Sequence, residues 1–320
     1  MSDAAAGPGE KRAGFVFGPV PSRRLGRSLG VDLVPFKTCT FDCIYCQVGR
    51  TTCLTTRRDS YVPVDEVVRE LEEKLAHSAR PDYITLSGAG EPTLNSDLGR
   101  VIARIRRITD IPIAILTNGS LLSDKEVRRA CSLADVVLPT LTAGDEAIFK
   151  RIHRPAEGIT FDGFVKGLVV FRTEFTGQIW LEVFLLAGIN DTEEAVGKIK
   201  QIADRIRPDR LQLNTAVRPT SETDARAVPE EEMHRLAKLL GPKAEVIADF
   251  SLAAAMPAVA AKKDEVLAML RRRPCTAEDV AQGLSIHLNE ALKYIGQLQR
   301  EEAITPSAKG DATYYSATRD

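Results

Sequence analysis

The sequence predicts an α/β protein in which parallel strands form a partial, TIM-like (β/α)6 barrel, followed by a small C-terminal winged helix-turn-helix domain. From about residue 15 to residue 250, apolar strand-like runs alternate with amphipathic helical stretches, as expected for parallel βαβ units. The chain also has 320 residues, which exceeds the roughly 250–300 residues of a large single domain. A doubly wound open sheet is the alternative arrangement of the same elements.

The composition is that of an ordinary globular protein, with 44% hydrophobic and 27% charged residues and a formal net charge of −1. These values exclude global disorder, a fibrous repeat and a strongly basic nucleic-acid binder. No apolar run approaches the roughly 20 residues that cross a bilayer, and the first residues contain no apolar signal-peptide core. We therefore expect a cytoplasmic protein that does not bind membranes and whose thiols stay reduced.

The barrel elements follow one another along the chain. Six strands and then a seventh are expected at 30–34, 83–87, 112–117, 136–138, 178–186, 210–214 and 245–248. The helices are expected at 64–76, 97–108, 123–132, 161–174, 192–206 and 230–240. Start signals support three of these helices, because Asp124, Thr192 and Pro229 stand at their openings.

The chain divides into four predicted parts: a flexible leader (1–14), the barrel (15–250), an Ala-rich linker (251–261) and the winged-helix-like domain (262–320). Three short helices are expected in the last part, at 262–272, 276–282 and 287–300. A hairpin of strands 303–306 and 313–317 follows, around a tight turn at 309–311. Thr276 is placed to cap the second helix, with Asp279 at the spacing of a capping box.

Three of the six cysteines fall within eight residues, in the segment Cys39-Thr40-Phe41-Asp42-Cys43-Ile44-Tyr45-Cys46. Three thiolates on one loop can each hold one iron of a [4Fe–4S] cluster, which leaves the fourth iron open to amine and carboxylate donors. A zinc site with Cys53 as the fourth ligand is the alternative at this point. Cys131 and Cys275 are expected to have no redox role, whereas Cys53 is left open.

The CxxxCxxC spacing, with aromatic Tyr45 before the last cysteine, resembles the signature of the radical S-adenosylmethionine (radical SAM) superfamily. The segment Gly88-Ala89-Gly90-Glu91-Pro92-Thr93 resembles that family's Gly-Gly-Glu-Pro motif, and Thr117-Asn118-Gly119 resembles its Thr-Asn-Gly turn. Each motif comes at the carboxyl end of a predicted strand, where α/β folds place their chemistry. The chain is therefore identified as a member of this superfamily, over about residues 15–250.

The segment 18–30, before the cysteines, resembles a branch that is grouped with wyosine-synthase-like Fe–S oxidoreductases. Wyosine synthases carry a second cluster on cysteines before the triad, and this sequence has no cysteine before Cys39. We therefore expect a single cluster.

The resemblance implies two cofactors, a [4Fe–4S] cluster and S-adenosylmethionine, with Cys39, Cys43 and Cys46 as metal ligands and catalytic residues. It implies reductive cleavage of S-adenosylmethionine to a 5′-deoxyadenosyl radical that abstracts hydrogen from a substrate. A reductant such as flavodoxin or ferredoxin is the implied partner.

The motif residues are assigned cofactor-binding roles by the same resemblance. Gly88, Ala89 and Gly90 are small, so that backbone can approach the methionine moiety closely. Glu91 faces its ammonium group or braces the loop, and Asn118 offers an amide to the ribose or carboxylate.

Four further cofactor contacts are expected from position along the chain. Tyr45 is placed near the adenine, and Thr140 follows a strand whose end binds the ribose or carboxylate in relatives. Glu182 alternates with two apolar residues of its strand and is expected to point into the barrel, and Asn214 ends the sixth strand.

A surface or packing role is expected for all four histidines, which are His77, His153, His234 and His287. Arg154 is expected to be a solvated loop residue or to pair with a carboxylate.

The substrate is not fixed by these motifs. Residues 11–58 contain nine basic and two acidic residues, an excess that favours RNA, tRNA or another macromolecule-borne target. A peptide, protein or small metabolite, including activation of a glycyl-radical partner, is the second class. A non-enzymatic Fe–S regulator that binds DNA is the third. The balanced charge of residues 262–320, nine basic and nine acidic, favours protein docking over duplex binding there.

Overall fold

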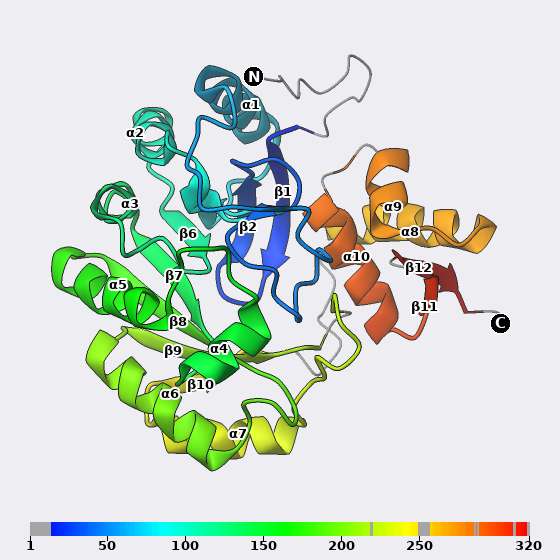
Figure 1. Ribbon diagram of the computed structural model, residues 1–320. Helices are drawn as coiled ribbons and strands as arrows, with labels where there is room; N and C mark the ends of the chain where they lie inside the picture. Colours follow the sequence, from blue (N-terminus) through cyan, green and yellow to red (C-terminus); the bar gives the residue numbers. More distant parts are fainter. Residues whose placement is uncertain are drawn as a thin grey trace.

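The computed structural model describes residues 14–217, 220–248, 257–284, 286, 288–309 and 312–318. Its centre is an eight-stranded sheet in the order β1-β2-β5-β6-β7-β8-β9-β10 (Figure 1). The strands are β1 (Val16–Ser22), β2 (Gly26–Val31), β5 (Tyr83–Leu86), β6 (Ile113–Thr117), β7 (Val136–Leu141), β8 (Gln178–Leu185), β9 (Arg210–Thr215) and β10 (Ala244–Val246). From β2 to β10 every pairing is parallel, and only β1 is antiparallel to its neighbour.

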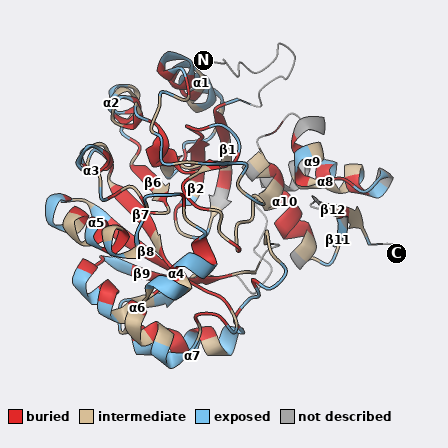
Figure 2. Ribbon diagram, in the orientation of Figure 1, coloured by how far each residue is buried: buried red, intermediate tan, exposed pale blue. Residues whose placement is uncertain are grey.

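The helices cover the outer face of this curved sheet (Figure 1). They are α1 (Val64–His77), α2 (Leu98–Ile108), α3 (Lys125–Cys131), α5 (Phe161–Glu174), α6 (Glu193–Ile206) and α7 (Glu230–Leu240). Figure 2 shows that the strands and the inner sides of these helices are buried. The buried side chains that these helices and the sheet contribute form a large apolar cluster. In the described part of the chain no strand pair joins β10 to β1, so the barrel is partial, as predicted.

Side-chain caps explain where several helices begin. Asp124 accepts a hydrogen bond from the amide of Glu126 at the start of α3. The hydroxyl oxygens of Thr160 and Thr192 accept hydrogen bonds from the third residue of α5 and of α6, respectively. Each cap satisfies an amide that has no partner within its own helix, which stabilises the helix start by about 1 kcal/mol.

Two barrel elements were not predicted. Strand β1 lies at the edge of the sheet, and its register with β2 shifts between Phe17 and Val20 because Gly18 and Pro19 interrupt the strand pattern. Helix α4 (Glu146–His153) follows β7 and lies over the end of the barrel where the parallel strands terminate (Figure 1). Two short strands, β3 (Thr38–Cys39) and β4 (Cys53–Leu54), pair with each other in the loop after β2.

The C-terminal part contains α8 (Pro257–Arg272), α9 (Ala277–Gly283) and α10 (Leu288–Arg300), then the antiparallel hairpin of β11 (Ile304–Lys309) and β12 (Ala312–Ala317). It has its own apolar cluster, which includes Val266, Leu270, Ile295 and Leu298. The capping box forms as predicted, because the amide of Thr276 donates to the Asp279 carboxylate and the amide of Asp279 donates to the Thr276 hydroxyl. Classification of this part as a winged helix-turn-helix remains a prediction.

The predicted leader and linker lie largely outside the described residues. Only residue 14 of the leader is described, and so are residues 257–261 of the linker. Those residues belong to α8, so helix, one of the two conformations open to the Ala-rich stretch, forms at its C-terminal end. Among the helices of the described residues, none is both long and apolar enough to span a membrane.

Candidate functional site

The cysteine loop leaves the carboxyl end of β2 and is tied by its backbone to the loop after β5. The amide of Lys37 donates to the carbonyl of Ala89 (3.1 Å), and the amide of Glu91 donates to the carbonyl of Thr38 (3.1 Å). The two loops approach so closely that a Cβ atom on Gly90 would lie 2.0 Å from the carbonyl oxygen of Thr38. Glycine at this position is therefore required by the chain itself, before any cofactor is considered.

Gly88 is constrained in the same way. A Cβ atom there would lie 1.9 Å from the carboxylate of Asp32, which accepts a hydrogen bond from the amide of Ala89. The small residues of the Gly88-Ala89-Gly90 motif thus let three chain segments meet at the carboxyl ends of β2 and β5.

Helix α4 holds the other side of the cysteine loop. Its last two carbonyl groups accept hydrogen bonds from the loop, Ile152 from the amide of Ile44 (3.0 Å) and His153 from the amide of Asp42 (2.9 Å). Carbonyl groups at a helix C-terminus have no partner within the helix, so the loop satisfies them. The cysteines are consequently positioned by backbone contacts to two distant parts of the chain.

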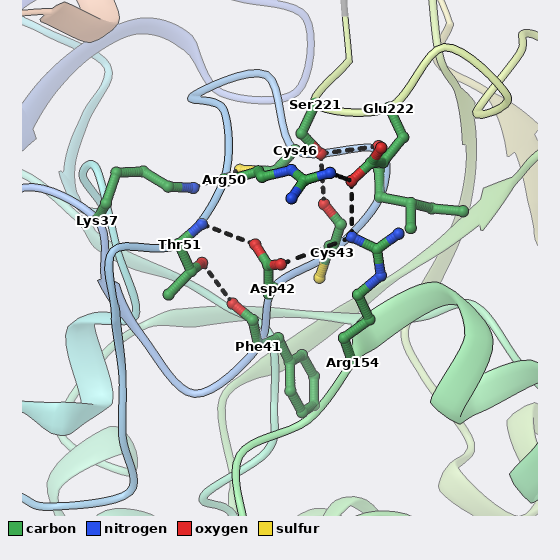
Figure 3. Close-up of polar contacts among 11 residues, drawn as sticks. Lys37, Phe41, Asp42, Cys43, Cys46, Arg50, Thr51, Arg154, Ser221 and Glu222 are labelled. Atoms are coloured by element: carbon green, nitrogen blue, oxygen red, sulfur yellow. Dashed lines mark hydrogen bonds and ion pairs between the residues drawn. The ribbon is translucent and has the colours of Figure 1, made fainter. Parts of the chain in front are cut away.

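Each of the three cysteine sulfurs faces a nitrogen donor, and the three donors come from different elements. Lys37 Nζ lies 3.2 Å from Cys46 Sγ, and both side chains are seen in Figure 3. His153 Nδ1 lies 3.1 Å from Cys43 Sγ. The amide nitrogen of Asn118, which follows β6, lies 3.6 Å from Cys39 Sγ. Hydrogen bonds of this kind stabilise thiolates and tune the iron–sulfur clusters that thiolates hold.

The chemistry of this donor set fits an iron–sulfur cluster, because three thiolates and neighbouring N–H donors are the ligands and the outer contacts that such clusters use. In the described part of the chain, no group of three or more His, Cys, Asp or Glu side chains is arranged around a point where one metal ion would sit. Cys53, the fourth ligand of the alternative zinc site, is exposed on β4.

Without a metal, two of the cysteines are held as thiols. Burial, together with the Glu91 carboxylate, raises the pKa of Cys39 to about 12. Burial also raises the pKa of Cys43 well above its ordinary value, and the neighbouring sulfurs add to the effect. Binding of a cluster to these sulfurs must therefore release protons.

His153 is completely buried, so of the surface and packing roles expected for this residue the structure shows packing. Its ring packs on Phe41, with centroids 4.4 Å apart, and against Phe149 at 5.1 Å. Its Nε2 atom lies 2.6 Å from the hydroxyl of Thr142, a residue that directly follows β7. Burial lowers the pKa of His153 to about 3, so the imidazole is neutral at neutral pH. The sequence carried no signal for this role, because His153 and Cys43 are 110 positions apart.

Glu91 braces its own loop. Its carboxylate accepts hydrogen bonds from the amide and hydroxyl of Thr93, the hydroxyl of Thr117 and the amide of Asn118, all at 2.5–3.0 Å. The side chain is 2% exposed, and burial raises the pKa of Glu91. Of the two roles considered for Glu91, these contacts match the bracing role.

The interior of the barrel brings together three of the residues singled out from the sequence. Thr140 Oγ1 and Asn214 Nδ2 donate to the two carboxylate oxygens of Glu182, each at 2.8 Å. Arg24, from the turn between β1 and β2, lies 3.4 Å from the same carboxylate. Burial alone would raise the pKa of Glu182, but the Arg24 guanidinium and both donors outweigh burial and hold the pKa below its usual range. Sequence reasoning missed Arg24, since nothing in its neighbours predicts that the turn enters the barrel.

Tyr45 lies between the barrel end and the cysteine loop. Its ring stacks on Phe184 of β8, with centroids 4.2 Å apart, and its edge faces His153. Burial raises the pKa of Tyr45 well above its ordinary value.

A network of charged residues encloses the outer side of the cysteine loop (Figure 3). Glu222 pairs with Arg154 at 2.7 Å and with Arg50 at 2.9 Å, and Arg154 also lies 3.7 Å from Asp42. The hydroxyl of Ser221 lies 2.9 Å from two carbonyl oxygens of the loop, those of residues 43 and 44. The segment after β9 is thereby fastened to the cysteine loop, and Arg154 is paired rather than solvated.

The basic residues of the segment 11–58 have partners wherever the structure describes them. Lys11 and Arg12 lie outside the described residues, and Arg23 has an interaction of its own. Arg24 pairs with Glu182, Arg50 with Glu222, Arg57 with Asp59 and Arg58 with Glu126. Arg27 donates to the Arg80 carbonyl and Lys37 to the Cys46 sulfur. These partners reduce the excess of positive charge near the cysteine loop, and the preference for RNA stays a prediction.

Comparison with known proteins places the chain in a family. Residues 33–199, about half of the chain, match the model of the radical SAM superfamily. A UPF0026 protein of Helicobacter pylori J99 is 32% identical over 306 residues, which covers 95% of this chain and 97% of that protein. A Brachyspira hyodysenteriae protein named GTPase Obg is 43% identical over 295 residues, which covers 89% of this chain and 42% of that protein. The chain therefore spans less than half the length of that relative.

Solved structures share the fold. A radical SAM methyltransferase from Sphaerobacter thermophilus superimposes with a TM-score of 0.53 at 16% identity, over 69% of this chain and 66% of that one. At such identity the likeness concerns the fold alone. The family match over about half of the chain leads to one conclusion: the chain belongs to the radical SAM superfamily, whose cofactors are a [4Fe–4S] cluster and S-adenosylmethionine.

Proposed function

We propose that Cys39, Cys43 and Cys46 hold a [4Fe–4S] cluster and that the chain cleaves S-adenosylmethionine reductively to abstract hydrogen from a substrate. The cluster and its ligand supply the chemistry, a 5′-deoxyadenosyl radical formed by one-electron reduction. The observation that carries the proposal is the set of three sulfurs, each facing a nitrogen donor from a different element, at the carboxyl ends of the parallel strands.

The protein's part is to bind and orient the cofactors. The backbone of the Gly88-Ala89-Gly90 segment lies directly beside the cysteine loop, which suits it to bind the methionine moiety. Glu91 keeps that backbone in place, because its carboxylate joins its own loop to Thr117 and Asn118. Asn118 lies beside Cys39 and has an amide suited to the methionine carboxylate or the ribose.

The polar group of Thr140, Glu182 and Asn214 would hold the nucleoside part of S-adenosylmethionine. A buried carboxylate that is ionised at neutral pH accepts hydrogen bonds strongly, and ribose hydroxyls are suitable donors. Tyr45, stacked on Phe184 near the cysteine loop, would contact the adenine. Aromatic side chains such as Tyr45 and Phe184 beside the site would also keep water away from a reactive intermediate.

The substrate is proposed to be either a macromolecule, such as RNA or tRNA, or a peptide, protein or small metabolite. Among the described residues, the basic side chains around the cysteine loop have partners. Their charge therefore does not by itself favour nucleic acid as the substrate. The reductant is proposed to be a small electron-transfer protein such as flavodoxin or ferredoxin.

The decisive experiment is anaerobic reconstitution with iron and sulfide, followed by dithionite and S-adenosylmethionine. We expect 5′-deoxyadenosine and methionine from the wild-type chain and neither from Cys43→Ala. Cys131→Ala is the matched control, because Cys131 is buried on α3 away from the cysteine loop. If Cys43→Ala loses iron but still forms 5′-deoxyadenosine, the proposal is contradicted. If the wild-type chain binds iron but forms no 5′-deoxyadenosine, a non-enzymatic regulator is favoured instead.

The substrate class is read from the same preparation. RNA that co-purifies under anaerobic conditions and, when prepared in deuterated form, transfers deuterium to 5′-deoxyadenosine would identify the first class. Transfer of deuterium from a deuterated peptide that co-purifies, and not from RNA, would identify the second class.

A further inference from the structure

A buried histidine contacts one of the three cysteine sulfurs directly. His153 ends helix α4, is fully enclosed, and places Nδ1 3.1 Å from Cys43 Sγ. Three aromatic rings surround its imidazole, with centroids at 4.4 Å for Phe41, 5.1 Å for Phe149 and 6.1 Å for Tyr45. The imidazole has therefore little freedom to turn away from the sulfur.

The second nitrogen of the ring has one partner, the hydroxyl of Thr142 at 2.6 Å from Nε2. Thr142 is fully buried and its backbone is fixed, because the side-chain amide of Asn190 donates to its carbonyl oxygen (2.6 Å) and to that of Phe184 (2.9 Å). Asn190 itself accepts a hydrogen bond from the amide of Leu186 (2.6 Å). Two sets of hydrogen bonds that meet at Thr142, one on its backbone carbonyl and one on its hydroxyl, thus link the ends of β7 and β8 to His153 and the Cys43 sulfur.

A metal-bound cysteine determines the direction of this chain. Its sulfur has no hydrogen, so the contact with Nδ1 is favourable only when the proton is on Nδ1. Nε2 then has no hydrogen and must accept one from the Thr142 hydroxyl. A neutral imidazole has a single N–H, so the hydrogen-free sulfur selects the tautomer with the proton on Nδ1, and the Thr142 hydroxyl supports that tautomer by donating to Nε2.

We infer that His153 raises the reduction potential of the cluster by donating Nδ1–H to the Cys43 sulfur, in the tautomer that the Thr142 hydroxyl supports by donating to Nε2. Adding an electron increases the negative charge on the sulfurs, so a donor to sulfur stabilises the reduced cluster more than the oxidised one. His153 is accordingly a positioning and tuning residue. The inference rests on the proposed function, because it requires the cluster to bind the three cysteines.

Two substitutions separate the nitrogen that faces the sulfur from the nitrogen that faces Thr142. In His153→Asn the amide nitrogen can take the place of Nδ1, whereas in His153→Gln it takes the place of Nε2. With an EPR-monitored redox titration of the reconstituted protein, without S-adenosylmethionine, we expect His153→Gln to lose about tenfold in the ratio of reduced to oxidised cluster at a fixed potential. For a one-electron couple this is a shift of about 59 mV to more negative potential. We expect His153→Asn to keep most of the wild-type potential.

Thr142 provides an independent test that leaves the imidazole in place. Thr142→Val removes the hydroxyl at nearly constant shape and is expected to lower the potential, whereas Thr142→Ser restores the wild-type value. His234→Gln is the control for the histidine variants, because His234 is exposed on α7. Iron and sulfide content, measured for each variant, ensures that the potentials are compared for the same cluster.

Equal potentials in wild type, His153→Gln and Thr142→Val at full iron content would overturn the inference, even if 5′-deoxyadenosine is formed. A wild-type chain that forms no 5′-deoxyadenosine but shows the expected order of potentials would contradict the proposed function and support the inference. The two failures are therefore distinguishable in one set of preparations.

Discussion

Glu182 shows how a single carboxylate can be kept ionised inside the barrel. The residue is 9% exposed, and two hydrogen-bond donors and the Arg24 guanidinium surround it. An unpaired charge in this position would be costly, whereas the pair with Arg24 offsets the desolvation. The same contacts hold the turn between β1 and β2 against the interior of the sheet.

This arrangement predicts a stability change at acidic pH. The pKa of Glu182 is lowered on folding, so below about pH 4.3, the ordinary value, the unfolded chain takes up a proton that the folded chain does not. The stability that the carboxylate contributes is therefore fully present above that pH and is lost as the pH falls through the folded pKa. We expect the free energy of unfolding of the wild type, from urea titrations of the metal-free chain, to decrease more steeply from pH 5 to pH 3 than that of Glu182→Gln.

Glu73→Gln, which changes an exposed residue of α1, is the control and should keep the wild-type slope. If the free energy of unfolding depends on pH in the same way in wild type and Glu182→Gln, Glu182 is not an ionised partner of Arg24 in the folded chain.

At the scale of elements, the segment after β9 and helix α4 enclose the cysteine loop from two sides. Glu222 is the residue they share, because its carboxylate pairs with Arg50 of the loop and with Arg154 at the end of α4. The amide of Glu222 also donates to the carbonyl of Ile44 at 3.0 Å. One side chain thus connects three segments that are far apart in the sequence.

Glu222→Gln should loosen this enclosure without unfolding the barrel. Two guanidinium groups would then face a neutral amide, and we expect a loss of about 1 kcal/mol in stability, since the pairs are partly exposed. The sharper readout is hydrogen exchange of the amides of Ile44 and Glu222, which we expect to accelerate. Glu146→Gln, which removes an exposed pair with Lys150 within α4, should leave those amides unchanged. Unchanged exchange in Glu222→Gln would mean that the backbone contacts alone hold the loop.

The helices and strands also show which parts of the fold can be predicted from the sequence and which cannot. Helix α5 was predicted at its observed bounds, because its apolar positions recur at helical spacing, and the structure adds a cap at Thr160. Strand β1 was missed because Gly18, Pro19 and Pro21 break its alternation. Helix α4 was missed because it is only eight residues long, too short for a clear periodic pattern.

The residues of the candidate site also fall into a group that could be predicted from the sequence and a group that could not. The cysteines and the glycine loop could be predicted because their spacing is local. The contact of His153 with Cys43, the approach of Lys37 to Cys46 and the entry of Arg24 into the barrel depend on tertiary packing. Spacing along the chain carries no information about such contacts. The close approach of Gly90 to Thr38 belongs to the same class.

At the scale of the whole molecule, the chain contains separate apolar cores. The largest lies between the sheet and its helices, and another lies within the C-terminal helices and hairpin. Separate cores favour separate unfolding steps.

Leu298→Ala should therefore destabilise the C-terminal part alone. Leu298 is fully buried in the C-terminal cluster, and such truncations typically cost about 2–5 kcal/mol. In calorimetry we expect one component of the unfolding transition to move to lower temperature while the component of the barrel stays in place. Leu284→Ala, at a half-buried position next to the same cluster, should have a smaller effect. A single transition that shifts as a whole would indicate that the two cores unfold together.

Strand β1 is the outermost strand of the sheet on its side, and helix α10 contacts it. An outermost strand has backbone groups that no neighbouring strand satisfies, and these can template pairing with another copy of the same chain. Because α10 lies against β1, we expect the C-terminal part to limit such self-association. Removal of that part should then first cause aggregation in concentrated solution, even if the chemistry at the cysteine loop is still intact.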